Sequence, residues 1–153
     1  NEPVTSSRIR TLLHDKMLLS EVWTLLGGAY LMCGQVQRGQ GIASGILGLP
    51  TANLSLPEPT KLIPPVGVYA CDVGIPHEKK MLQGVANIGL RPTFAGTNLS
   101  IEVFILDYSG DLYGHSLELW LKHYLRPEIK FANADLLKEQ IHRDIEFVKT
   151  QFL

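Results

Sequence analysis

The chain has 153 residues, of which 45% are hydrophobic, enough for one globular domain with a buried core. Its 14 basic and 15 acidic residues give a net charge of −1, which excludes the strongly basic surface of a general nucleic-acid binder. No stretch approaches the roughly 18 consecutive apolar residues of a membrane-spanning helix, and the N-terminal residues lack the pattern of a signal peptide. We therefore expect a cytoplasmic protein whose cysteines, Cys33 and Cys71, are buried free thiols.

Residues 5–26 are predicted to form two short helices, because apolar residues recur there at helical spacing. Thr5, Ser6 or Ser7 could cap the first helix, and Ser20 could cap the second. Gly27 and Gly28 are expected to end the second helix.

From Tyr30 onward the apolar period changes to two, which predicts strands separated by glycine, proline and asparagine. The candidate strands are Tyr30–Gln37, Gly67–Gly74, Met81–Gly89, Ser100–Tyr108 and Leu117–Leu125. The proline-rich segment 57–65 cannot be a central strand and is expected to be a long loop. Short strands with turns between them favour an antiparallel barrel or sandwich.

A final helix is predicted after residue 133, capped by Asn133 or Asp135. One face carries an apolar stripe that would pack on a core: Leu137, Ile141, Ile145, Val148 and Phe152. The charged residues of the other face are expected to be solvated: Lys138, Glu139, Arg143, Asp144, Glu146 and Lys149.

The segment 38–54, RGQGIASGILGLPTANL, combines a glycine tract with a proline and two small polar residues. The glycines would let backbone N–H groups approach phosphate oxygens, although neither the P-loop nor the Rossmann spacing is present. In extended chain Thr51 and Asn53 point to the same face, and their oxygens would suit Mg²⁺. A turn stabilised by Asn53 would explain the same residues without any ligand.

This segment resembles the nucleotide-binding segment of riboflavin kinases, which have a glycine-rich loop followed by a PTAN motif. Further resemblances follow in the same order, at GVY (67–69), NIGLRPTF (87–94), EVFILD (102–107), DLYG (111–114) and LRPEIKF (125–131). Together they cover roughly residues 30–150. The resemblance implies a mainly β fold: a six-stranded antiparallel, Greek-key-like barrel with a C-terminal helix and a short helical N-terminal lead-in.

The resemblance also implies ATP:riboflavin 5'-phosphotransferase activity, with Mg²⁺, ATP as co-substrate, and riboflavin and FMN as substrate and product. Thr51 and Asn53 would hold the metal. Glu102, on the opposite strand face from Ile101 and Val103, would be the base that accepts the ribityl 5'-hydroxyl proton. Without the resemblance, a glutamate at a barrel rim reaching water is the better explanation of Glu102.

The remaining site residues are implied by the same motifs. ATP would be bound by Gly39, Gly41, Gly45, Gly48, Pro50, Thr51, Asn53 and Tyr108; riboflavin would be bound by Arg91, Phe94, Arg126, Glu128 and Phe131. A surface ion pair between Arg126 and Glu128 was the alternative. Many family members carry Arg or Lys where this chain has Gly45, and Arg38 or Lys61 could supply that cation.

The string Thr5–Arg10 resembles the end of the adenylyltransferase module of bacterial bifunctional riboflavin kinase/FMN adenylyltransferases (FAD synthetases). We therefore interpret residues 1–28 as a helical linker and residues 29–153 as the kinase domain. The expected partners are small-molecule substrates and an N-terminal FMN adenylyltransferase module, with no nucleic acid and no membrane. The alternative function is a barrel that binds flavin or FMN without turnover.

Overall fold

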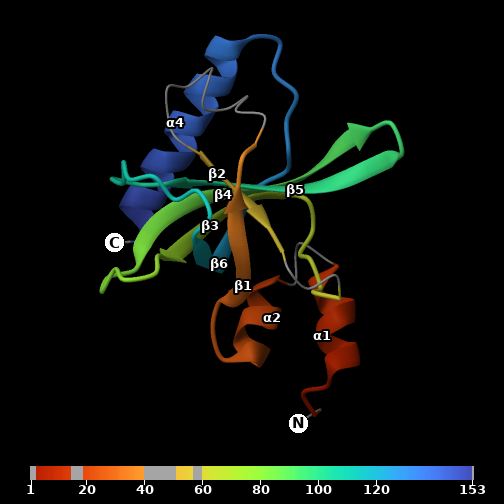
Figure 1. The fold of residues 1–153 in the computed structure, drawn as a ribbon. Helices are drawn as coiled ribbons and strands as arrows, with labels where there is room; N and C mark the ends of the chain where they lie inside the picture. The colour runs from red at the N-terminus through yellow and green to blue at the C-terminus, as the bar shows by residue number, and fades with distance from the viewer. Residues whose placement is uncertain (1–2, 15–18, 40–50, 57–59, 153) are drawn as a thin grey trace.

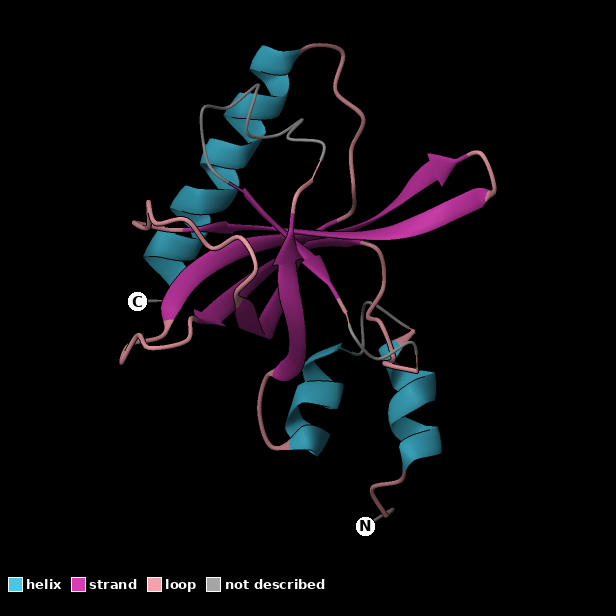
Figure 2. Cartoon of the chain, viewed as in Figure 1, coloured by secondary structure: helices cyan, strands magenta, loops and turns pink. Residues whose placement is uncertain are grey.

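A computed structural model describes residues 3–14, 19–39, 51–56 and 60–152. Its strands are β1 (Tyr30–Gln37), β2 (Thr51–Ser55), β3 (Gly67–Gly74), β4 (Leu82–Thr93), β5 (Gly96–Ile105) and β6 (Ser116–Arg126). They close into an antiparallel barrel in the order β1-β2-β5-β4-β3-β6 (Figures 1 and 2). Because β2 lies beside β5 while β3, β4 and β5 follow as hairpins, the topology is that of a Greek key, which confirms the fold class.

The barrel core follows from the alternation of side chains along each strand. Ile101, Val103 and Ile105 point inward from β5 and are almost fully buried, as are Leu117, Leu119 and Leu121 from β6. The residues between them point outward. The side-chain faces predicted for Glu102 and its neighbours are therefore confirmed.

The N-terminal helix α2 (Leu19–Leu26) leads into the start of β1, and α1 (Ser6–Leu13) lies beside α2 (Figure 1). Leu13 and Val22 are fully buried in the same apolar cluster as the barrel core. The Thr5 side chain caps α1 by accepting from the Arg8 backbone N–H at 3.2 Å. Gly27 ends α2 with a φ of 76°, where glycine is favoured. Ser20 lies inside α2, so its predicted capping role is wrong.

The C-terminal helix α4 (Ala134–Gln151) covers part of the outer face of the barrel (Figure 1). Asn133 caps it by accepting from the Leu136 backbone N–H at 2.9 Å, as predicted. Val148 packs against Val68, Val85 and Leu106 in a second apolar cluster outside the barrel. No helix in the described ranges is long and apolar enough to cross a membrane.

Two predictions about side-chain environment are wrong. Asp144 was placed on the solvated face of the last helix but is buried, because it pairs with Arg126 of β6. Cys33 was expected to be buried but is exposed, because it points outward from β1, whereas Cys71 is buried as predicted. Both thiols are free. Burial raises the pKa of the Cys71 thiol, with a smaller contribution from Asp72.

Candidate active site

Strand register lines up five residues in one row across the outer face of the barrel. The row reads Asn53 (β2), Glu102 (β5), Asn87 (β4), Val68 (β3) and Arg126 (β6), each directly opposite the next. Directly opposite residues of antiparallel strands present their side chains to the same face. Residues that are far apart in the sequence therefore form one largely polar row, with Glu102 between two carboxamides.

The larger cavity beside this row has a volume of about 450 Å³ and lies between the barrel and the end of β6 and helix α4. Its apolar lining comes from Val68, Val85, Pro92, Phe104, Ile129, Phe131, Leu137 and Ile141, and its polar lining from Thr51, Asn87, Arg91, Glu102, Arg126, Glu128 and Asp144. An apolar cleft with a few convergent polar groups is typical of a site for a small organic ligand. Its size and lining suit a flat, mostly apolar ring carrying a polar chain.

Glu102 lies in this cavity with its side chain only 13% exposed. Its Oε1 atom forms an ion pair with Nη2 of Arg91 on the neighbouring strand β4. The structure thus brings Glu102 and Arg91 together, and the exposed-rim explanation for Glu102 does not hold.

A smaller cavity of about 260 Å³ adjoins the larger one, and Thr51 lines both. Asn53, Arg38, Gly39, Tyr108 and Tyr113 also line it. The Arg38 guanidinium carbon lies 5.0 Å from the centre of the Tyr113 ring, a cation–π contact that holds this cation at the cavity. Lys61 instead lies over the ring of Tyr30, so of the two alternative cations only Arg38 reaches this cavity.

We expect Gly39→Ala to impair the smaller cavity without unfolding the protein. A Cβ atom at position 39 would overlap the carboxamide of Asn53, and that flexible side chain would have to rotate away. The KM for the ligand of this cavity should rise by about tenfold, because a misplaced donor weakens orientation. Steady-state kinetics and a thermal melt of the variant check this. Gly28→Ala, where an added Cβ has nothing within 4 Å, is the matched control. An unchanged KM for Gly39→Ala would contradict the expectation.

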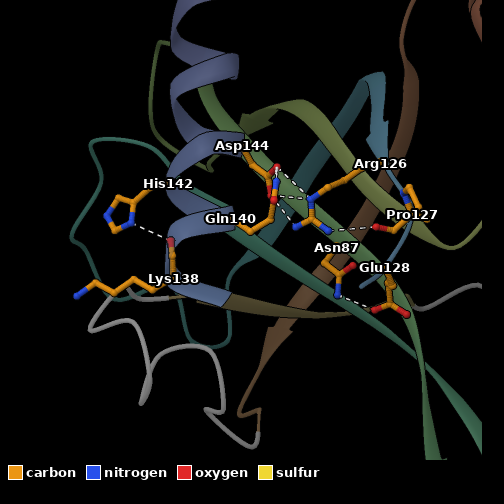
Figure 3. Close-up of polar contacts among 8 residues, drawn as sticks. All are labelled: Asn87, Arg126, Pro127, Glu128, Lys138, Gln140, His142 and Asp144. Atoms are coloured by element: carbon orange, nitrogen blue, oxygen red, sulfur yellow. Dashed lines mark hydrogen bonds and ion pairs between the residues drawn. The ribbon is translucent and has the colours of Figure 1, made fainter. Parts of the chain in front are cut away.

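Arg126 and Glu128 do not form the surface ion pair that was the alternative to a role in binding (Figure 3). Arg126 donates to the Asp144 carboxylate from Nε at 3.0 Å and from Nη2 at 2.7 Å. Glu128 accepts from Nδ2 of Asn87 at 2.9 Å. Both residues line the larger cavity, and so does Phe131.

Phe94 is not brought to the site: it is fully exposed at the tip of the β4–β5 hairpin, which projects from the barrel (Figure 2). Gly41, Gly45, Gly48 and Pro50 lie outside the described residues. The structure therefore places Thr51 between the two cavities, Glu102 and Arg91 in the larger one, and Gly39, Asn53 and Tyr108 in the smaller one.

Two residues of the larger cavity were missed by the sequence reasoning, Asn87 and Asp144. In the part of the chain that the structure describes, Oδ1 of Asn87 is buried and has no hydrogen-bond partner. Such an atom is costly and is often found at functional sites. The period-two pattern around residues 85–89 could have found Asn87, since it points to the same face as Val85. The helical pattern gave no comparable signal for Asp144.

Comparison with known proteins gives one consistent answer for this barrel. A family model described as "Flavokinase: Riboflavin kinase" matches residues 26–152. The bifunctional riboflavin kinase/FMN adenylyltransferase of Escherichia coli K12 is 41% identical over 142 residues, covering 92% of this chain and 44% of that protein. The protein of the same name from Haemophilus influenzae is 39% identical over 150 residues, covering 97% and 47%. The chain therefore spans a little under half the length of these relatives.

Two solved structures share the fold. A Streptococcus pneumoniae structure described as a macrolide-efflux protein has a TM-score of 0.85 and 33% identity, with 95% of this chain and 46% of that chain covered. The riboflavin kinase of Trypanosoma brucei has a TM-score of 0.52 and 23% identity, with 78% and 77% covered. With a family model matched across the whole barrel and helix α4, and relatives near 40% identity, the chain belongs to the riboflavin kinase family.

Proposed function

We propose that the chain transfers the γ-phosphoryl group of ATP to the 5'-hydroxyl of riboflavin, giving FMN and ADP. The observation that carries this proposal is the position of Glu102 in the larger cavity, directly opposite Asn53, which lines the smaller one. The larger, more apolar cavity suits the flavin ring, and the smaller one, with Arg38 and Gly39, suits a nucleotide. Family membership supports the same assignment.

Thr51 and Asn53 are the residues that would hold Mg²⁺. Both point to the outer face of β2, two positions apart, and both offer neutral oxygen donors beside the smaller cavity. This donor set fits an ion that keeps several waters and takes its charge balance from phosphate oxygens. When bound, Mg²⁺ supplies charge neutralisation for the polyphosphate.

The protein's own contribution is orientation and proton acceptance. The larger cavity would hold the flavin so that its ribityl chain reaches Glu102. Glu102 would take the proton of the ribityl 5'-hydroxyl while the oxygen of that hydroxyl attacks the γ-phosphorus. The bond from the γ-phosphorus to the bridging oxygen breaks, and ADP leaves with that electron pair. Arg38 would bind phosphate oxygens in place of the cation absent at position 45. No covalent phospho-enzyme is needed.

We further propose that this region works in the cytoplasm, where ATP and Mg²⁺ are supplied, and that its product passes to an adenylyltransferase module. The relatives from Escherichia coli and Haemophilus influenzae are named as bifunctional proteins that join the two activities. This region would make FMN, and the adenylyltransferase module would convert FMN to FAD.

The test is FMN formation by the 153-residue chain from riboflavin and ATP, with and without Mg²⁺, followed by chromatography, together with riboflavin binding followed by flavin fluorescence. We expect turnover that requires Mg²⁺. Riboflavin binding without any turnover would support the alternative of a non-catalytic flavin-binding barrel. Absence of both would contradict the assignment of the larger cavity.

A further inference from the structure

Asp144 is the most deeply buried charged residue in the part of the chain that the structure describes. Its exposed fraction is 6%, and among the described residues it is the one that combines full burial with an acidic or basic side chain. The proposed reaction does not use its carboxylate. Moving a carboxylate out of water costs free energy unless the carboxylate is paired and hydrogen-bonded. The burial of Asp144 therefore needs a structural or functional explanation.

The Asp144 carboxylate is saturated with hydrogen bonds (Figure 3). Arg126 donates to it from Nε, at 3.0 Å to Oδ1 and 3.1 Å to Oδ2, and from Nη2, at 2.7 Å to Oδ2. Gln140, one helical turn earlier, donates to Oδ1 at 3.0 Å. Since the side chain of Arg126 is only 15% exposed, its guanidinium is committed to this pair rather than available to a ligand anion.

The pair also fixes the chain that leaves β6. Nη1 of Arg126 donates to the carbonyl oxygen of Pro127 at 3.1 Å, and the next residue, Glu128, accepts from Asn87 at 2.9 Å. The Glu128 carboxylate occupies the space that a Cβ atom at Gly89 would need. A sequence of contacts therefore runs from helix α4 through Arg126 and Glu128 to Asn87, the neighbour of Glu102 in the polar row.

Asp144 and Arg126 form a wall of the larger cavity, and a cavity of about 340 Å³ lies on their other side. The apolar residues Leu137 and Ile141 of the same helix line the larger cavity as well. Neither Asp144 nor Arg126 lines the smaller cavity. A movement of this pair would therefore act directly on the larger cavity and not on the lining of the smaller one.

We infer that Asp144 is a positioning residue for the flavin: by holding Arg126, it sets helix α4 and the segment 126–128 at the spacing that the flavin ring requires. This inference rests on the proposed function of the larger cavity. A buried ion pair is weak evidence for stability, because an apolar pair of similar volume often stabilises a protein equally well. Replacing the Asp144–Arg126 pair by an apolar pair can therefore separate its effect on flavin binding from its effect on stability.

The first test is Asp144→Asn in the full chain. We expect riboflavin to bind about tenfold more weakly by flavin fluorescence, since a small displacement of a wall is enough for a loss of this size. The KM for ATP should change by less than about twofold. Glu139→Ala is the matched control, because Glu139 forms an exposed pair with Arg143 at 3.7 Å on the same helix and should leave both values unchanged.

The second test is the double variant Arg126→Met with Asp144→Leu, which removes both charges and keeps a folded, apolar wall. We expect its melting temperature to return toward that of the wild type while riboflavin binding stays weak. Wild-type riboflavin binding in the double variant would overturn the inference, as would unchanged binding in Asp144→Asn. A wild-type chain that makes no FMN and binds no riboflavin would instead overturn the proposed function.

Discussion

Glu102→Gln is expected to lower the kcat of FMN formation by about 100-fold or more while riboflavin still binds. General-base assistance contributes factors of roughly 100 to 10,000, and glutamine keeps the shape of the side chain but cannot accept the proton. Glu102 lies in the larger cavity, and it lies directly opposite Asn53 of β2, which lines the smaller one. Removing its charge should therefore affect the chemical step more than binding.

Steady-state kinetics with saturating ATP and Mg²⁺, combined with riboflavin titrations, check this expectation. The matched control is Glu118→Gln, because Glu118 is also an outward-facing glutamate on a barrel strand but lies on β6, away from the cavities. The control should retain wild-type kcat. If Glu102→Gln keeps kcat within about threefold of the wild type, the ion pair with Arg91 is structural and another group accepts the proton.

The strands could largely be predicted because each carries its own alternation of buried and exposed residues. Strands β1 and β3 begin and end at the predicted residues. Strand β5 ends at Ile105, three residues before the predicted Tyr108, and Asp107 beyond it has a positive φ of 56°. At the other end β5 begins early, at Gly96, and β4 continues past its predicted end to Thr93, because the two strands keep pairing beyond the barrel, where Pro92 is tolerated opposite Thr97. The alternation stops where the hairpin leaves the core, so the pattern could not show this extension.

Strand β2 could not be found from its own residues. It is five residues long and follows Pro50, so the polar pair Thr51 and Asn53 reads equally well as a turn. Its strand conformation comes from pairing with β5, in which Thr51 of β2 lies opposite Phe104 and Asn53 lies opposite Glu102. Only the family resemblance supplied a sixth strand.

Asp144 shows the limit of helical patterns. It lies three residues after Ile141 and four before Val148, at the border of the apolar stripe, and a charge there is usually solvated. Its partner Arg126 belongs to another element, and the contact depends on how α4 crosses the barrel. The faces of Glu102, Thr51 and Asn53 were predictable from period two, whereas the division into two cavities arises only from tertiary packing.

Asn53→Ala is expected to reduce kcat/KM for ATP by about 100-fold, because it removes one of two proposed protein ligands of Mg²⁺. Riboflavin binding measured without nucleotide should stay close to that of the wild type, since Asn53 lines the smaller cavity and not the larger one. Initial rates measured across a range of Mg²⁺ concentrations should show a higher requirement for the metal in the variant.

Ser55→Ala provides the matched control for that experiment. Ser55 lies two residues further along the same strand, so its side chain points to the same outer face, but it lines neither of the two cavities. Loss of a hydroxyl from this face alone should therefore leave the Mg²⁺ dependence unchanged. If Asn53→Ala and Ser55→Ala behave alike, the metal is held by phosphate oxygens and water without Asn53. If only Asn53→Ala requires more Mg²⁺, the carboxamide of Asn53 is a ligand of the metal, and the metal site lies directly beside the proposed base Glu102.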